Sequence, residues 1–209
     1  MTSEARNDCT LDALVCRGFN TIVADPPWEY PSKMGRGRDT RPGRVVLRGG
    51  DGLCCPYPTM TLEQIKALPV GECAADGCHL WLWTTNAFLR QGFDVMQAWG
   101  FKYLAPVHWI KPSGIGAWFI NRTQTVLFGY RKPCRMGEGR YSPNIITSTS
   151  PRRHSEKPEE AFALIESVSD GPRLELFARR PREGWTVWGN EVEANDNAHS
   201  SRVSAAKEG

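Results

Sequence analysis

The sequence lacks the features that would place it in a membrane or send it out of the cell. No apolar run approaches the roughly 18 residues that a membrane-spanning helix needs. The opening residues, MTSEARNDCT, contain no apolar core of a signal peptide. We therefore expect a cytoplasmic protein that has no membrane partner.

Two common nucleotide-binding motifs and a metal-binding pattern are also missing. Each Gly-x-Gly pair lacks the third glycine of the dinucleotide fingerprint, and no phosphate-binding P-loop is present. Seven cysteines occur, but Cys73 and Cys78 beside His79, and the adjacent Cys54 and Cys55, fit the spacing of structural zinc sites poorly. An odd cysteine count without a signal peptide favours reduced thiols over disulfides, so we expect no metal.

What is present suits one compact domain. The 209 residues are enough for a single α/β core but not for two independent domains. Hydrophobic residues make up 40% and charged residues 23%, which excludes a wholly disordered chain. The formal net charge of +3 permits a polyanionic partner without requiring one.

Predicted strands and helices alternate along the chain. Strands are expected at 21–24, 79–84, 101–110, 125–130, 173–177 and 185–188. Helices are expected between Thr61 and Pro69, between Asn86 and Gly100, and between Pro158 and Asp170. The second should be capped by Asn86 and have an apolar face of Phe88, Phe93, Met96 and Trp99, while 131–153 should form a loop. This order predicts an α/β fold, with a mostly parallel sheet, helices on both faces and ligands at the carboxyl ends of the strands.

The sharpest motif is the tetrad Asp25-Pro26-Pro27-Trp28, directly after the first predicted strand. Two successive prolines fix the backbone and remove two N–H donors, which leaves carbonyl acceptors and the Asp25 carboxylate beside an aromatic plane. Asp25 and the Pro26 carbonyl could accept the two hydrogens of an adenine N6 amine, while Trp28 or Tyr30 stacks on the ring. A structural Asp-Pro turn with a packed tryptophan explains the tetrad equally well.

Six further motifs accompany the tetrad in a familiar order. They are Tyr57-Pro58-Thr59-Met60, Trp83-Thr84-Thr85-Asn86, Trp99-Gly100-Phe101-Lys102-Tyr103, Lys157-Pro158-Glu159, Glu175-Leu176-Phe177-Ala178-Arg179 and Gly189-Asn190. With these motifs the sequence resembles the MT-A70 family, whose namesake is a subunit of the mRNA adenosine-N6 methyltransferase. It is similar to the compact members found in bacteria and phages.

The resemblance implies a Rossmann-like class I methyltransferase fold with permuted motif order. It implies S-adenosylmethionine as cofactor, and Asp25, Pro26, Pro27 and Trp28 as the catalytic tetrad. By the same resemblance Lys157 binds the cofactor, and Glu175, Phe177, Arg179 and Asn190 line its site. Without the resemblance, Lys157 would be an ordinary solvated charge before a helix. The methyltransferase domain would span 19–191, after an N-terminal extension at 1–18 and before a flexible tail at 192–209.

Two basic segments flank these motifs and are the expected contacts to nucleic acid. The Gly-rich segment 31–52 carries five arginines, including Arg36, Arg38 and Arg41, and should be a mobile loop that closes over phosphates. The segment 131–153 is the second. Solvated surface is the alternative for both. Gln124, where many members of the family carry an acidic residue, is a candidate contact to the target nucleoside.

The predicted function is therefore methyl transfer from S-adenosylmethionine to the N6 amine of adenine in nucleic acid. We expect DNA in preference to RNA, because the compact chain lacks the long extensions of the RNA-modifying relatives. The alternatives are an RNA adenosine-N6 methyltransferase and a catalytically weak partner that binds nucleic acid with the same fold, in a homo- or hetero-oligomer. A cytosine-N4 methyltransferase fits less well, because its tetrad usually begins with Ser and ends with Tyr.

Overall fold

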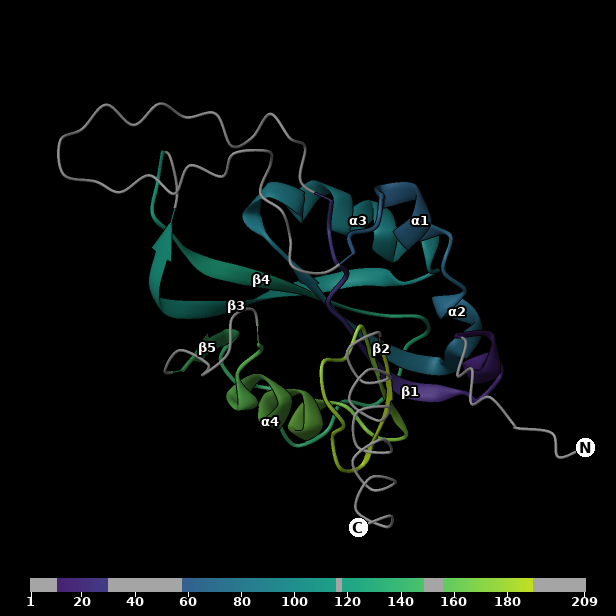
Figure 1. Ribbon diagram of the computed structural model, residues 1–209. Helices are drawn as coiled ribbons and strands as arrows, with labels where there is room; N and C mark the ends of the chain where they lie inside the picture. Colours follow the sequence, from purple (N-terminus) through teal and green to yellow (C-terminus); the bar gives the residue numbers. More distant parts are fainter. Residues whose placement is uncertain (1–10, 30–57, 116–117, 149–155, 190–209) are drawn as a thin grey trace, which may run out of the picture.

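The computed structural model describes residues 11–29, 58–115, 118–148 and 156–189 (Figure 1). They form one seven-stranded sheet in the order β5-β3-β4-β2-β1-β6-β7. The strands are β1 (Phe19–Ala24), β2 (Ala74–Thr84), β3 (Lys102–Ile115), β4 (Asn121–Tyr130), β5 (Ile145–Thr147), β6 (Arg173–Leu176) and β7 (Trp185–Trp188). Of these strands, β4 alone runs against the others, because only its pairings with β2 and β3 are antiparallel. The predicted mostly parallel sheet is confirmed.

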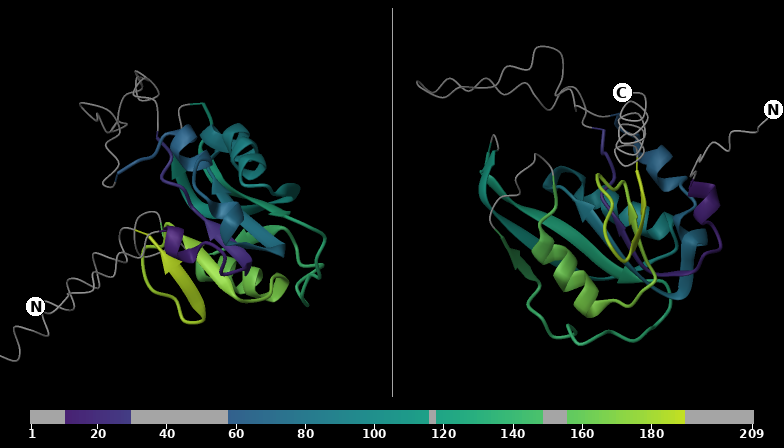
Figure 2. Two further views of the ribbon diagram at one scale, coloured as in Figure 1. Left: turned by 90° about the vertical axis from the view of Figure 1, so that its right-hand side faces the viewer. Right: turned by 60° about the horizontal axis from the view of Figure 1, so that its bottom comes forward.

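Helices cover both faces of the sheet, and each strand supplies side chains to both. The helices are η1 (Leu11–Leu14), α1 (Leu62–Lys66), α2 (Val70–Cys73), η2 (Asn86–Phe88), α3 (Leu89–Ala98) and α4 (Glu159–Val168). In β2, Leu80 and Leu82 join the core beneath α1, α2 and α3, whereas Trp81 and Trp83 join the core beneath α4. Figures 1 and 2 show α4 on the opposite side of the sheet from α1 and α3.

The central strand β1 positions the start of the tetrad. It pairs in parallel with β2 and with β6, and its residues Ile22 and Ala24 face one core while Val23 faces the other. The ladder ends at Ala24, because the prolines that follow have no N–H to donate. As predicted, Asp25 therefore emerges at the carboxyl end of a buried strand.

The region from Asn86 to Gly100 differs from the prediction. A 3-10 turn spans Asn86–Phe88 before α3 begins, and the Asn86 amide donates to Asn121 Oδ1 (3.0 Å) instead of capping a helix. Phe93, predicted on the apolar face, is 39% exposed and contacts Tyr103 edge-on. Gly100, with φ of 80°, ends the helix as predicted, because glycine adopts this left-handed conformation without strain.

The outer strands also extend beyond the prediction. β3 and β4 form a long antiparallel hairpin, and β5 lies within the segment 131–153 that was predicted as a loop, so that part of the prediction was wrong. Only Ile146 of β5 is buried, and a strand this short has too little alternation to be recognised. The Thr61 capping box is confirmed, with Gln64 N donating to Thr61 Oγ1 (3.3 Å).

Residues before position 19 contribute to the core, since Leu11 and Leu14 of η1 are buried. The boundaries of the domain at residues 19 and 191 stay predictions, and the predicted tail at 192–209 lies outside the described residues. No helix in the described part of the chain is long and apolar enough to cross a membrane.

The Gly189 backbone lies against the turn that follows β6. A Cβ at Gly189 would lie 2.6 Å from the Ala178 nitrogen and 2.9 Å from the Phe177 carbonyl carbon. Ala178 N also donates to Trp188 O (2.9 Å), so no space opens between the two segments. Only glycine fits this approach.

We expect Gly189→Ala to lower the free energy of unfolding by roughly 2–4 kcal/mol, because the methyl group would press against backbone that cannot move aside. Gly18→Ala is the control: its Cβ would meet open space, so its φ of 70° alone should cost about 1 kcal/mol. Urea unfolding followed by circular dichroism measures both. Equal losses would show that the close approach at Gly189 is wrong.

Candidate active site

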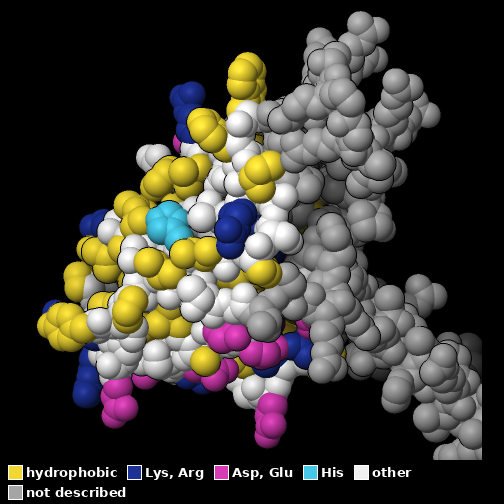
Figure 3. Space-filling view, turned by 90° about the vertical axis from the view of Figure 1, so that its left-hand side faces the viewer, with side chains coloured by type: hydrophobic (Ala, Val, Ile, Leu, Met, Phe, Trp, Pro, Cys, Tyr) yellow, Lys and Arg dark blue, Asp and Glu magenta, His cyan; other side chains and the backbone are white. Residues whose placement is uncertain are grey.

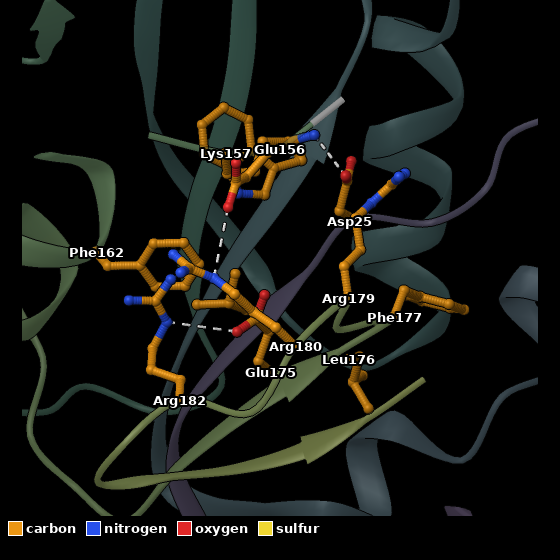
Figure 4. Close-up of a pocket in the computed structure, with 12 residues that line it drawn as sticks. Asp25, Glu156, Lys157, Phe162, Glu175, Leu176, Phe177, Arg179, Arg180 and Arg182 are labelled. Carbon is orange, nitrogen blue, oxygen red and sulfur yellow. Dashed lines mark hydrogen bonds and ion pairs between the residues drawn. The ribbon is translucent and has the colours of Figure 1, made fainter. Parts of the chain in front are cut away.

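A cleft lies at the carboxyl ends of β1, β2 and β6 (Figure 4). The space between its lining residues is about 460 Å³, and this figure includes open solvent, so the cleft is an open one. Five of the predicted site residues line it: Asp25, Lys157, Glu175, Phe177 and Arg179. The structure thus brings the predicted catalytic carboxylate together with four of the predicted cofactor residues.

Asp25 and Lys157 form an ion pair at the centre of this cleft. Lys157 Nζ donates to Asp25 Oδ2, and the two side chains are only 10% and 23% exposed. The ammonium also lies 5.0 Å from the centroid of the Trp83 ring, within range of a cation–π interaction. Lys157 is therefore not the solvated charge that the sequence left as an alternative.

Glu175 projects from β6 into the same cleft. Burial raises the pKa of its carboxyl group to about 7, and the nearby Asp25 charge adds to the rise, whereas Arg182 opposes it. Arg182 Nε lies 3.6 Å from Glu175 Oε2. Near neutral pH, Glu175 therefore exists in both protonation states, and a ligand that prefers one of them would shift the balance.

A group of charges ties the segment after β6 to the start of α4. Glu159 accepts from Arg182 Nη1 at 2.6 Å and also from Arg180, and these guanidinium contacts lower the pKa of the Glu159 carboxyl. The Arg182 guanidinium lies 3.4 Å from the centroid of the Phe162 ring, and Arg180 Nε lies 3.5 Å from Glu156 Oε1. Figure 4 shows four of these side chains at the cleft: Glu156, Phe162, Arg180 and Arg182.

Phe177, the residue directly after β6, has an unusual backbone conformation. Its φ of 63° lies in the left-handed region, which costs energy for a bulky residue and persists where the surroundings hold it. The ring packs edge-on against Trp188 (centroids 5.4 Å apart), and the Gly189 backbone lies against the same turn. The predicted strand thus ends one residue early, and Phe177 is fixed at the cleft.

Trp28 lies on the other side of the sheet from the cleft. Its ring is 6% exposed and stacks on Phe88 (centroids 5.3 Å, interplanar angle 13°) in the core beneath α1 and α3. The expectation of an exposed tryptophan plane beside Asp25 is wrong for this structure, because Phe88 covers one face of the ring. The packed tryptophan of the alternative interpretation is what the structure shows.

The proline carbonyls of the tetrad already accept hydrogen bonds. Pro26 O accepts from Trp28 N (2.9 Å), and Pro27 O accepts from Met60 N (2.9 Å). A carbonyl oxygen has two lone pairs, so the Pro26 carbonyl can accept one more donor.

Other predicted site residues are not tested by this geometry. Tyr30, Arg36, Arg38, Arg41 and Asn190 lie outside the described residues. Gln124 is on β4, two positions from Val126 and so on the α4 face of the sheet, but it is not among the residues that line the cleft. Its contact to a nucleoside stays a prediction.

The candidate metal ligands Cys78 and His79 face opposite sides of the sheet. Cys78 is buried in the core beneath α1 and α3, whereas His79 faces the other side and bonds Cys134 Sγ (2.9 Å) and Ser169 Oγ (2.8 Å). Among the described residues, no three His, Cys, Asp or Glu side chains are grouped closely enough to hold a metal ion.

Sequence reasoning missed much of the charged wall. Arg180, Arg182 and Glu156 line the cleft, and only the neighbouring Arg179 and Lys157 were predicted. The available signal was the dense charge run Arg179-Arg180-Pro181-Arg182 directly after a predicted strand, where ligands of parallel sheets bind. In the sequence, Glu159 appeared only as part of the Lys157-Pro158-Glu159 motif, and the structure also pairs it with two arginines.

Comparisons with known proteins agree with this geometry. The Type II methyltransferase M.MunI of Mycoplasma sp is 28% identical over 192 residues, covering 85% of this chain and 79% of the relative. The human N(6)-adenine-specific methyltransferase METTL4 is 29% identical over 201 residues, covering 83% of this chain and 37% of the relative. The N(6)-adenosine-methyltransferase MT-A70-like protein of Drosophila melanogaster is 26% identical over 196 residues, covering 88% and 28%.

The chain thus spans most of M.MunI but less than two fifths of these two animal relatives. The profile of the MT-A70 family matches residues 19–191, the same span that the motifs predicted. This match includes the strand that ends at Asp25, the lysine paired with it and the β6 motif that completes the cleft. The chain belongs to the MT-A70 family.

Proposed function

We propose that this protein is a methyltransferase that uses S-adenosylmethionine to methylate the N6 amine of adenine in nucleic acid. The observation that carries the proposal is the meeting of Asp25, Lys157 and Glu175 in one cleft at the carboxyl edge of the sheet. Relatives named as N(6)-adenine and N(6)-adenosine methyltransferases support the same chemistry. A cytoplasmic location is part of the proposal.

The cleft suits the chemical groups of this cofactor. Lys157 would hold the methionine carboxylate and Glu175 the ribose hydroxyls, with Phe177 and Arg179 beside the adenine. Among the residues that the structure describes, Trp83 Nε1 is a buried donor without a hydrogen-bond partner, and the Trp83 side chain lines the cleft. Buried donors of this kind are expected where a ligand supplies the missing acceptor. The bound cofactor would supply an electrophilic methyl group.

Asp25 is the residue that we assign to the acceptor amine. Its Oδ2 is held by Lys157, and its Oδ1 is the second acceptor of the same carboxylate. An N6 amine that donates to Asp25 and to the Pro26 carbonyl keeps its nitrogen lone pair directed at the incoming methyl group. Both acceptors are fixed at the end of β1, so the backbone does not have to rearrange when the amine binds.

DNA is the preferred substrate in this proposal. The chain spans 79% of M.MunI but only 30% of the N(6)-adenosine-methyltransferase catalytic subunit METTL3. M.MunI and METTL4, at 28% and 29% identity, are also slightly more similar to this chain than METTL3, at 24%. Arg36, Arg38, Arg41, Tyr30 and Gln124 remain proposed contacts to nucleic acid, and Asn190 a proposed contact to the cofactor.

Incubation with isotope-labelled S-adenosylmethionine and separate pools of DNA and RNA tests the function. The products are digested to nucleosides and identified by mass. The proposal predicts label in N6-methyl-2′-deoxyadenosine. Label in cytosine, or none in either pool, would contradict it, and label in RNA alone would overturn the preference for DNA.

We expect Asp25→Asn to reduce turnover about a hundredfold or more while the fold is retained, because the amide lacks the charge that the transition state requires. Asp76→Asn is the matched control, since Asp76 also pairs with a lysine (Lys132, 3.0 Å) but is 78% exposed and belongs to the amino end of β2. Initial rates and thermal unfolding of both variants provide the measurement. Near-normal turnover of Asp25→Asn would contradict the assignment of Asp25 to the acceptor amine.

Lys157→Ala should weaken binding of S-adenosylmethionine about tenfold to a hundredfold, because one charge-assisted contact is lost. The affinity for nucleic acid should hardly change. Isothermal titration calorimetry measures the cofactor affinity, with the exposed Lys132→Ala as control. Unchanged cofactor affinity in Lys157→Ala would show that Lys157 serves only to hold Asp25.

The affinity for S-adenosylmethionine should rise with pH through the region of the Glu175 pKa, about 7. The ionised carboxylate can accept a hydrogen bond from each of the two ribose hydroxyls. The protonated acid carries an O–H group of its own, so it can accept from both hydroxyls less well. Between about pH 6 and about pH 8 the ionised fraction rises from roughly one tenth to nine tenths, so the gain can approach tenfold.

Calorimetry at both pH values, with Glu175→Gln as the reference, isolates this contribution from the titration of the cofactor itself. The variant has no ionisable group at this position, so its affinity should lack the component that depends on Glu175. Parallel pH dependence in both proteins would show that Glu175 does not bind the cofactor.

A further inference from the structure

The β3–β4 hairpin projects past the edge of the sheet where Asp25 lies. Ala24 is level with Leu82 of β2, so Asp25 is near the level of Trp83, which pairs with Val126 of β4. From Val126 the paired strand continues for five residues to Asn121, which is about 16 Å at the usual rise. The end of the hairpin therefore lies well beyond the level of Asp25, and Figure 1 shows β3 and β4 extending to the left of the view, away from β1.

The described residues at the end of this hairpin expose large hydrophobic side chains to solvent. Trp118 is 94% exposed, Phe119 82% and Ile120 48%. Tryptophan is highly buried on average in folded proteins, so full exposure of two successive aromatic residues requires an explanation. We call Trp118 and Phe119 the aromatic tip.

The surroundings of the aromatic tip carry positive charge. The sequence between Asp94 and Glu138 contains no acidic residue, and Lys111 and Arg122 flank the tip on its two strands. Burial and the Lys157 charge lower the pKa of Lys111, which places this lysine within the electrostatic reach of the cleft. Figure 3 shows this side of the molecule, with hydrophobic and uncharged groups over most of it, a few separate Lys and Arg side chains, and acidic side chains mainly in its lower part.

Two hydrogen bonds hold the outer part of the hairpin. Asn86, directly after the Trp83-Thr84-Thr85 segment, donates to Asn121 Oδ1 (3.0 Å). Arg122 Nε donates to Lys111 O (3.0 Å) across the two strands. These contacts hold the direction in which the aromatic tip projects relative to Asp25.

We propose that Trp118 and Phe119 stack on unpaired nucleic-acid bases next to the target adenine, so that one strand runs from the aromatic tip to the cleft. Base–aromatic stacking beside a basic surface is the usual way in which proteins bind single-stranded segments without reading their sequence. A span of about 16 Å accommodates roughly four or five stacked bases at 3.4 Å each. The inference rests on the proposed function, because it takes nucleic acid as the substrate.

A protein partner fits the aromatic tip less well. Two aromatic side chains bury at most about 300–500 Å², whereas a stable interface buries about 800 Å² on each partner. The absence of acidic residues across the hairpin also favours a polyanion. The structure therefore favours stacking on bases over docking of a second chain.

The test compares the native protein, the double variant Trp118→Ala/Phe119→Ala, and Leu104→Ala. Leu104 is 50% exposed and lies near the amino end of β3, opposite the aromatic tip, so it is an exposed hydrophobic residue outside the predicted nucleic-acid contacts. Fluorescence anisotropy with fluorescein-labelled single-stranded DNA of mixed sequence, and with its duplex, gives affinities over a salt series. Sedimentation velocity gives the oligomeric state of each protein.

We expect the double variant to bind the single strand roughly tenfold more weakly at every salt concentration. The slope of log affinity against log salt should stay the same, because stacking releases no counterions. Leu104→Ala should match the native protein in affinity, and the thermal unfolding of all three proteins should agree closely, since these side chains are largely exposed.

Equal affinities for the double variant and the native protein would overturn the inference alone. A weaker affinity that accompanies the loss of a native oligomer would also overturn it, because the tip would then be a protein interface. If the native protein binds neither the single strand nor the duplex, the proposed function fails as well, so the two failures are distinguishable.

Discussion

The ion pair between Asp25 and Lys157 joins the parts of the chain that the active site needs. The two residues are 132 positions apart, one at the end of β1 and the other just before α4. Both side chains are mostly shielded from water, so their attraction is screened less than that of a surface pair. Removal of either partner would leave a shielded charge without compensation, which usually costs several kcal/mol. The position of α4 and the direction of the acceptor carboxylate are thus coupled.

Carboxylates and cations in the cleft nearly cancel in number. Three carboxylates and four cations line it, and several are paired with one another rather than with solvent. A ligand that carries both a carboxylate and positive charge can exchange with these pairs without leaving an isolated charge behind. The raised pKa of Glu175 adds a group whose proton can leave when such a ligand binds. A zwitterionic cofactor is therefore a better match for this cleft than a purely anionic nucleotide.

The positions of site residues along the chain could be predicted from the sequence more fully than their contacts. The apolar strand before Asp25 and the order of strands and helices placed this carboxylate at the ligand edge of the sheet, and the structure confirms that placement. The side of the sheet on which Trp28 lies could not be predicted, because two prolines break the alternation that assigns faces. β5 was missed because three residues contain almost no pattern.

The pairing of charged residues that are distant in the chain could not be predicted from the sequence either. The residues Glu159, Arg180 and Arg182 each have a local explanation as helix-terminal or surface charges, and only the fold shows that they meet. The length of the β3–β4 hairpin could not be predicted either, because the outer part of β4, residues 121–124, is polar on both faces and gives no alternating signal. Patterns of hydrophobicity identify elements and faces, whereas contacts between polar residues depend on topology.

A double-mutant cycle on cofactor binding tests most directly whether Asp25 and Lys157 act as one unit. Calorimetric affinities for S-adenosylmethionine would be measured for the native protein, Asp25→Ala, Lys157→Ala and the double variant. Residues in direct contact that share a ligand should show a coupling energy of about 1 kcal/mol or more. Effects that add to within about 0.5 kcal/mol would contradict the account, because the pair would then have no common role in the cleft.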